Sequence, residues 1–166
     1  MPSPTNRLHS VPPGCTACGT AAICAITGAS KDEAERALRT AIAEDGMDPG
    51  DLASALPKHV GRALELLDWE LVSGQGNKID ARRQIRPLGI SLQFLGTVAD
   101  FLQQNTQTDI LLCTAFKAGA GDSHTFAVDG HELQDNGLFA NTSETSSWRV
   151  ARTLGCRRAA NPSSSS

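Results

Sequence analysis

Small and apolar residues recur with helical spacing near the N-terminus of the chain. The first set is Cys18, Ala21, Ala22, Ala25 and Ile26. Positions i, i+3, i+4, i+7 and i+8 lie on one face of an α-helix. Almost every residue between them is also small or apolar, so the pattern predicts a helix buried nearly all round. We expect it to begin near Thr16 and to end at Gly28, since glycine commonly terminates helices.

A second helical stripe follows directly. Ser30 and Glu33 have the spacing of a capping box, in which each side chain bonds the other residue's backbone N–H. The apolar positions behind them are Ala34, Ala37, Leu38, Ala41 and Ile42. This pattern predicts an amphipathic helix that ends at Gly46.

The middle of the chain is less regular. Asp51 is expected to cap a short third helix that runs through Val60, and Pro57 is expected to distort it. Residues 63–72 are apolar with a mixed period, and we favour a strand there. Residues 79–93 are compatible with either a helix or a strand.

The second half of the chain has the pattern of short strands. Residues 97–104 predict a short helix with apolar residues on one face. The predicted strands are 109–116, 124–128, 131–134 and 147–154. Asp129-Gly130 is a typical two-residue hairpin turn between the second and third of these strands. Helices that precede an antiparallel sheet indicate an α+β domain.

The domain organisation follows from these elements. We expect residues 1–14 to be extended because they are rich in Pro and Ser, and residues 15–156 to form a single domain. Residues 157–166 are expected to be a disordered tail, since the chain ends in a low-complexity run of serines.

Composition narrows the classes of function. The chain has 166 residues and a formal net charge of −3, which argues against a dedicated nucleic-acid-binding protein. No apolar run approaches the ~20 residues that span a bilayer, and residues 1–13 lack the apolar core of a signal peptide. We therefore expect a cytoplasmic protein that does not bind membranes. Its five cysteines are then expected to be reduced.

Three residues have the chemistry of a nucleophilic site. Cys18 falls in the first turn of the predicted buried helix, where unpaired N–H groups and the helix dipole favour a thiolate. His124 begins a predicted strand and can act as base and then as acid. With Asp129 and Gly130 at the centre of the turn, Asp135 is directly opposite His124 across the hairpin. This register favours Asp135 over Asn136 as the partner that orients the imidazole, because Asn136 points to the other face.

The motif Cys18-Gly-x-x-Ala-Ile, followed by His124-x-x-x-Val-Asp-Gly-x-x-x-x-Asp135, resembles papain-like cysteine peptidases. Within that fold the chain is most similar to the bacteriocin-processing, or double-glycine, peptidase family, over residues 15–43 and 97–137. The resemblance implies a papain-like fold, with a buried Cys-bearing helix packed on an antiparallel sheet. It also implies a thiol protease that cleaves a peptide or isopeptide bond of a peptide or protein substrate. Its triad would be Cys18, His124 and Asp135, with no cofactor.

The family usually places a Gln before the nucleophile to donate a hydrogen bond to the oxyanion. Residues 9–17 contain neither Gln nor Asn. The backbone N–H of Cys18 remains as one donor. The candidates for a second donor are Asn6, His9, Ser10 and Thr16.

Two other interpretations of these residues remain open. A chain with the same fold and weak or no catalysis would be a binding module that holds a peptide or a host protein. Cys15 and Cys18, spaced as C-x-x-C, are also half of a zinc site, although the chain has no second C-x-x-C pair.

Overall fold

The computed structural model describes residues 7–72, 95–117, 123–140 and 142–159. Three helices come first and an antiparallel sheet follows, so the predicted α+β class is confirmed. The elements are α1 (Cys18–Thr27), α2 (Lys31–Glu44), the 3₁₀ turn η1 (Leu52–Ser54), α3 (Pro57–Leu66), β1 (Trp69–Val72), α4 (Val98–Gln104), β2 (Ile110–Lys117), β3 (Ser123–Asp129), β4 (Glu132–Gln134), the 3₁₀ turn η3 (Leu138–Ala140), α5 (Thr142–Ser147) and β5 (Trp148–Arg158).

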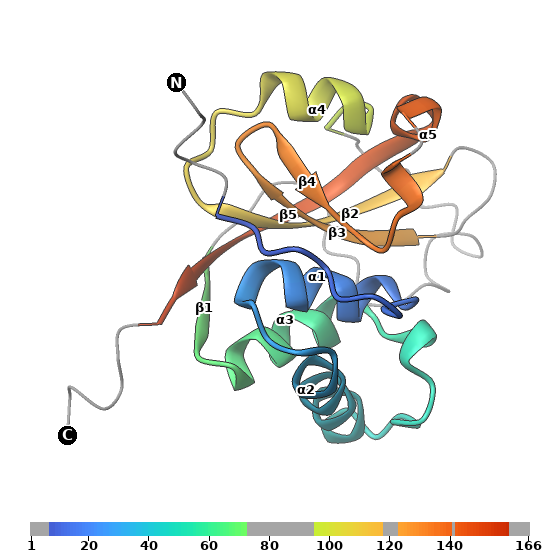
Figure 1. The fold of residues 1–166 in the computed structure, drawn as a ribbon, viewed down its shortest axis with the longest axis vertical. Helices are drawn as coiled ribbons and strands as arrows, with labels where there is room; N and C mark the ends of the chain where they lie inside the picture. Colours follow the sequence, from blue (N-terminus) through green and yellow to red (C-terminus); the bar gives the residue numbers. More distant parts are fainter. Residues whose placement is uncertain (1–6, 73–94, 118–122, 141, 160–166) are drawn as a thin grey trace.

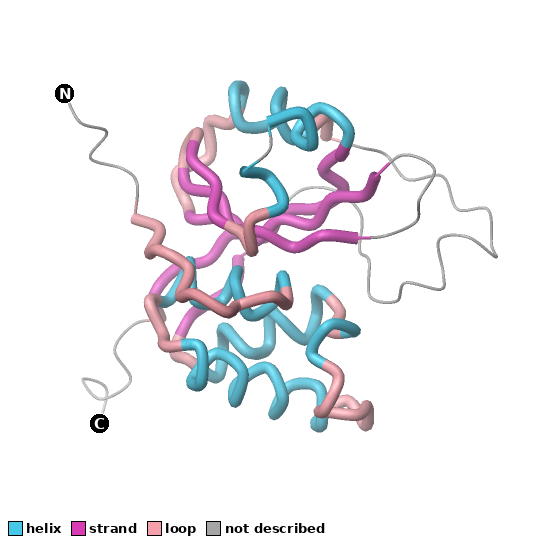
Figure 2. The backbone as a smooth tube through the Cα atoms, turned by 45° about the vertical axis from the view of Figure 1, so that its right-hand side comes forward, coloured by secondary structure: helices cyan, strands magenta, loops and turns pink. Residues whose placement is uncertain are grey.

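The sheet has the strand order β1-β5-β2-β3-β4, and every neighbouring pair is antiparallel. Helices α1, α2 and α3 cover one face of the sheet, whereas α4 and α5 lie on the other face (Figure 1). The view in Figure 2 shows the same separation, with the α1–α3 layer below the strands. No helix in the described part of the chain is long and apolar enough to cross a membrane.

Helix α1 is the central buried element. It ends where predicted, at Gly28, which adopts a left-handed conformation (φ 76°) and donates its N–H to the Cys24 carbonyl. Every residue from Gly19 to Ile26 is buried, because α2 and α3 lie on one side of the helix and β3 on the other. The absence of a side chain at Gly19 lets α3 approach, since an added Cβ there would lie 3.0 Å from the Val60 side chain.

Helix α2 begins with the predicted capping box. The Ser30 hydroxyl accepts the Glu33 N–H, and the Glu33 carboxylate accepts the Ser30 N–H, both at 3.2 Å. Its apolar stripe is buried against α1 and α3. The helix ends at Glu44, and the left-handed Gly46 follows shortly after it.

The prediction for the third helix is wrong in its bounds. Pro57 is the first residue of α3, where its missing N–H needs no partner, so the proline starts the helix and does not distort it. The helix continues to Leu66, and only Trp69–Val72 of the predicted strand 63–72 is extended. The ambiguous segment 79–93 lies outside the described residues.

The later elements follow the predicted pattern closely. Thr97 caps α4 by accepting the Asp100 N–H at 3.1 Å. Strands β2 to β5 correspond to the four predicted strands, and β5 extends to Arg158, two residues into the expected tail. Residues 160–166 lie outside the described residues. The short elements η3 and α5 were not predicted, because they have no apolar periodicity.

The predicted register of the β3–β4 hairpin is wrong by two residues. Asp129 pairs with Glu132, so Gly130 and His131 form the turn. Continuing this register places His124 diagonal to Asp135 and not directly opposite. A shift of two residues leaves each side chain on its predicted face of the sheet, because side chains alternate with a period of two.

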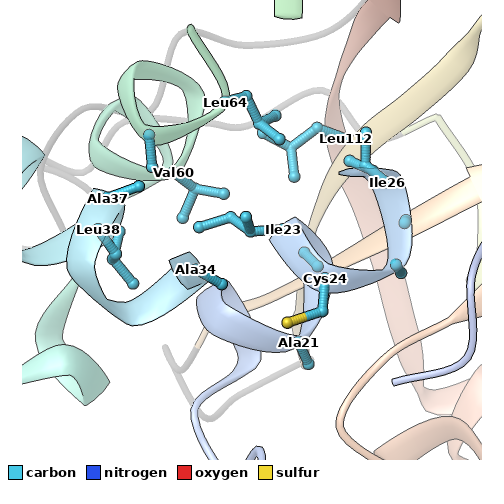
Figure 3. Close-up of a cluster of buried hydrophobic side chains, with 14 of the residues drawn as sticks. Ala21, Ile23, Cys24, Ile26, Ala34, Ala37, Leu38, Val60, Leu64 and Leu112 are labelled. Atoms are coloured by element: carbon cyan, nitrogen blue, oxygen red, sulfur yellow. The ribbon is translucent and has the colours of Figure 1, made fainter. Parts of the chain in front are cut away.

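Two hydrophobic cores lie on opposite faces of the sheet. Figure 3 shows side chains of the first core, which α1, α2 and α3 contribute together with Leu112 of β2. The second core lies under α4 and η3. Its buried members are Val98, Phe101, Leu111, Cys113, Ala115, Phe126, Val128, Phe139, Trp148 and Val150. Successive residues of β2 therefore alternate between the two cores.

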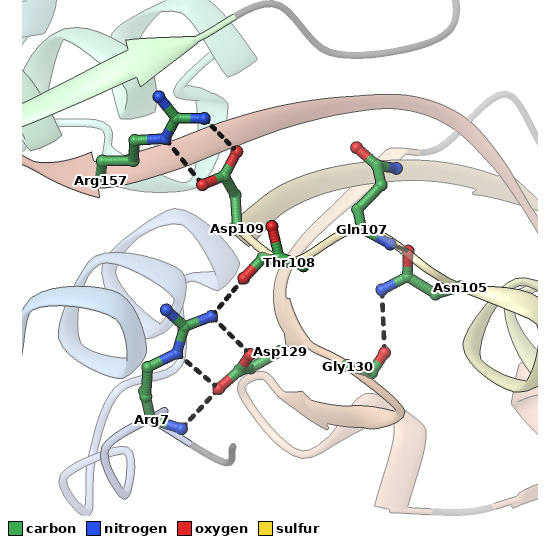
Figure 4. Close-up of polar contacts among 8 residues, drawn as sticks. All are labelled: Arg7, Asn105, Gln107, Thr108, Asp109, Asp129, Gly130 and Arg157. Atoms are coloured by element: carbon green, nitrogen blue, oxygen red, sulfur yellow. Dashed lines mark hydrogen bonds and ion pairs between the residues drawn. The ribbon is translucent and has the colours of Figure 1, made fainter.

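Residues 7–17 run beside α1 without regular secondary structure. The segment is attached at its start, where Arg7 binds the Asp129 carboxylate and donates to the Thr108 carbonyl (Figure 4). Further along, the His9 N–H donates to the Ala25 carbonyl at 2.8 Å. These contacts lead the chain along the helix and back to Cys18, the first residue of α1.

Candidate functional site

Cys18 occupies the N-terminal end of α1. It is the first helical residue, and the preceding Ala17 offers no side chain to cap the helix. The first N–H groups of a helix have no acceptor within the helix and carry the positive end of its dipole. The thiol is partly exposed. A helix N-terminus favours the thiolate form of a cysteine, and the partial exposure of Cys18 leaves it accessible to reagents.

His124 is held in a buried aromatic pocket near the start of β3. Its side chain is only 5 % exposed. Its ring stacks on Phe126 at 6.0 Å between centroids, meets Phe139 edge-on at 5.0 Å, and lies 5.9 Å from Trp148. These three rings restrict the imidazole to one orientation.

Asp135 lies directly after β4 and binds His124. The His124 Nε2 and Asp135 Oδ2 atoms are 2.9 Å apart. The carboxylate also accepts the N–H groups of Gly137 at 2.9 Å and Phe139 at 3.0 Å. Burial raises the pKa of Asp135, but the hydrogen bonds from these three donors outweigh it and hold the pKa below its ordinary value. The group is therefore a carboxylate at neutral pH.

The imidazole of His124 is strongly basic in this environment. Burial lowers its pKa, while hydrogen bonds and charge from Asp135 and Cys18 raise it, and the net pKa is about 9. Since Nε2 faces Asp135, Nδ1 is the ring nitrogen left for the thiol. The structure thus brings the three predicted residues together, with His124 between Cys18 and Asp135.

The prediction that Asp135, and not Asn136, is the partner of His124 agrees with the geometry. Asp135 binds the imidazole, whereas the Nδ2 of Asn136 donates to the Thr16 carbonyl at 2.8 Å. Adjacent residues therefore bind different parts of the site: Asp135 binds His124, and Asn136 binds the loop before Cys18.

The predicted oxyanion donors are widely separated. Thr16 is exposed and lies two residues before Cys18. His9 packs its ring against Gly28, at the opposite end of α1 and about 15 Å along the helix from Cys18. Ser10 is exposed and follows His9. Asn6 lies outside the described residues.

The other four cysteines are all buried. Burial, followed by interaction with Cys15, raises the pKa of Cys24 to about 12. Burial also raises the pKa of Cys156 to about 12 and that of Cys113 well above its ordinary value. Within the described ranges, no group of three or more His, Cys, Asp or Glu side chains is arranged to hold a metal ion.

A pocket of about 540 Å³ lies beside the loop that precedes Cys18. One wall is the loop 14–17 that leads into Cys18, and the opposite wall contains residues 50–53 before and within η1. Lys31 and Glu35 of α2 form an ion pair at 3.0 Å along its side. The pocket is therefore lined by both polar and apolar residues, and it lies against the loop that leads into Cys18.

Sequence reasoning missed Phe139. Its N–H binds Asp135 and its ring contacts His124, so it supports both members of the pair. Its position four residues after Asp135, beyond an Asp-Asn-Gly turn, is the only local signal that could have indicated it.

No protein-family model, no curated protein sequence and no solved structure matches this chain.

Proposed function

We propose that the protein is a cysteine hydrolase with a papain-like arrangement of Cys18, His124 and Asp135. The observation that carries the proposal is the buried imidazole bound on one side by a carboxylate and on the other by a thiol at a helix N-terminus. A core histidine needs only one satisfied contact, whereas this one links a nucleophile to a charged partner.

The proposed reaction is hydrolysis of an amide bond through a thioester. The Cys18 thiolate attacks the carbonyl carbon, and the backbone N–H of Cys18 donates to the oxyanion. The C–N bond then breaks, and the amine leaves with the proton of the His124 imidazolium. Neutral His124 next takes a proton from water, which attacks the thioester. The carboxylic acid leaves, and the thiolate and imidazolium are restored.

The pocket at residues 14–17 and 50–53 is the proposed place for the substrate chain. It adjoins the loop that leads into Cys18, and the polar groups in its walls can bind the backbone N–H and C=O groups of an extended peptide. An Ala53→Trp substitution would fill this pocket without touching Cys18. We expect slower labelling by a peptidyl chloromethyl ketone and an unchanged rate with iodoacetamide, which needs no pocket.

Thiol alkylation across pH tests the enzyme proposal. At pH 6 we expect iodoacetamide to modify Cys18 at least tenfold faster than a free cysteine peptide, and a His124→Gln variant to lose this advantage. Mass spectrometry identifies the modified residue, and the four buried cysteines serve as internal controls. A rate at pH 6 equal to that of the free peptide would refute the proposal.

A binding module with the same arrangement is the second candidate. Its support is the lack of a side-chain amide in residues 9–17, which leaves the second oxyanion donor unidentified. A fast reaction of Cys18 with iodoacetamide, combined with no hydrolysis of any member of a peptide-amide library, would favour this function.

A further inference from the structure

Asn136 connects the two parts of the chain that carry the proposed catalytic groups. Its Nδ2 donates to the Thr16 carbonyl at 2.8 Å, a contact between residues 120 positions apart. Thr16 belongs to the loop that enters α1 two residues before Cys18. The preceding residue, Asp135, binds His124. One dipeptide therefore holds the imidazole with its first side chain and the nucleophile's loop with its second.

The amide has an unfavourable feature that packing alone does not explain. Its Oδ1 atom is buried, and no hydrogen-bond partner is present for it among the described residues. A buried acceptor without a partner is destabilising, and an apolar side chain of the same shape would avoid that cost. An apolar side chain at position 136 would serve stability better than an asparagine. A need for a hydrogen-bond donor at this fixed point explains why the side chain is an amide.

The surroundings make the Asp135-Asn136 segment rigid. The Asp135 carboxylate accepts the N–H groups of Gly137 and Phe139, which fixes the turn that follows it. Phe139 in turn packs edge-on against the imidazole. The segment that presents the Asn136 amide is thus the same rigid unit that orients His124.

We infer that Asn136 is a positioning residue for the proposed reaction: its amide holds the loop before Cys18 at a set distance from the imidazole of His124. The inference rests on the proposed function, since it concerns the alignment of the same thiol and imidazole. A thiolate–imidazolium pair depends steeply on alignment, and a displacement of ~1 Å costs on the order of 10²-fold in rate.

The chain offers a matched control at the other end of the same hairpin. The Nδ2 of Asn105 donates to the Gly130 carbonyl at 2.9 Å, a bond of the same kind and length, shown in Figure 4. Asn105 also accepts the Gln107 N–H at 3.1 Å, so both of its polar atoms are satisfied.

The test compares Asn136→Leu and Asn136→Asp with Asn105→Leu in the full chain. Both Asn136 variants keep the size of the side chain and lose the donor. The readouts are the rate of Cys18 modification by iodoacetamide from pH 5 to pH 9 and the urea midpoint of unfolding. We expect the Asn136 variants to react tenfold or more slowly at pH 6, with the urea midpoint of Asn136→Leu close to that of the wild type. Asn105→Leu should lower the midpoint and leave the rate unchanged.

The outcomes separate this inference from the proposed function. A fast wild-type reaction that is unchanged in both Asn136 variants would overturn the positioning role and leave the proposed function standing. Equal losses of rate in Asn136→Leu and Asn105→Leu would also overturn it, because the effect would then follow general destabilisation. A wild-type Cys18 that reacts no faster than a free peptide thiol would overturn both.

Discussion

Replacing Asp135 with Asn should lower the basicity of His124 with little change in shape. The carboxylate accepts three hydrogen bonds, from the imidazole and from the N–H groups of Gly137 and Phe139. A side-chain amide has one acceptor oxygen and one NH₂ group, so at least one of these donors would face another donor. The negative charge beside the ring would also disappear.

The size of the effect follows from the surroundings of the ring. The pKa of His124 is about 9, against an ordinary value near 6.5 for histidine. At ~1.4 kcal/mol per pKa unit, its partners favour the imidazolium by roughly 3 kcal/mol beyond the cost of burial. Loss of an adjacent opposite charge changes a pKa by about 1 to 3 units. We therefore expect the pKa of His124 in Asp135→Asn to fall from about 9 to between about 6 and 8.

The assay is an NMR titration of the histidine Cε1–H signals in the wild type and in Asp135→Asn. The chain has four histidines, and a His124→Gln variant assigns the relevant signal. Iodoacetamide labelling of Cys18 at pH 6 should slow by tenfold or more in the same variant. If the His124 signal titrates at the same pH in both proteins, the carboxylate is not the cause of the raised pKa and the reasoning is wrong.

Three further predictions concern stability. The pKa of His124 is higher in the folded chain than in the unfolded chain, so its contribution to the free energy of unfolding is complete below pH 6.5 and is lost as the pH rises to about 9. Urea titrations should show the free energy of unfolding falling across this window. An equal fall in a His124→Gln variant would contradict this. Leu38→Ala should cost about 2–5 kcal/mol in urea unfolding because Leu38 is fully buried, whereas Met47→Ala, at a side chain 39 % exposed, should stay within about 0.5 kcal/mol. Gly155→Ala should cost about 1–3 kcal/mol because a Cβ would overlap Val72, and a second substitution, Val72→Ala, should recover part of that loss; no recovery would show that the overlap is not the cause.

Local signals explain what could be predicted from the sequence. The end of α1 at Gly28 and the start of α2 at Ser30 depend on residues within a few positions of each other, so their chemistry is visible in the sequence. Pro57 has two common roles, disruption inside a helix and the first position of a helix. The choice between them depends on packing of α3 against α2, which is a non-local contact.

The candidate site shows the same difference between local signals, which the sequence reveals, and non-local contacts, which it does not. The contact between His124 and Asp135 was predicted from a hairpin register that is wrong by two residues, and it survives because the error is even and preserves the face. The position of β5 between β1 and β2 joins strands far apart in the sequence, and no local pattern indicates it. The same is true of the contact between Asn136 and Thr16, which only the folded chain brings together.

The two cores on opposite faces of the sheet have a consequence for the contact between Cys18 and His124. Cys18 is anchored through α1 to one core, and His124 is embedded among the rings of the other. Sulfur and imidazole therefore meet only while both layers stay docked on the strands between them. A small displacement of the α1–α3 layer relative to the sheet would separate the pair while each core remained intact. On warming, the reactivity of the Cys18 thiol should therefore report the loss of contact between the layers earlier than helix or strand content does.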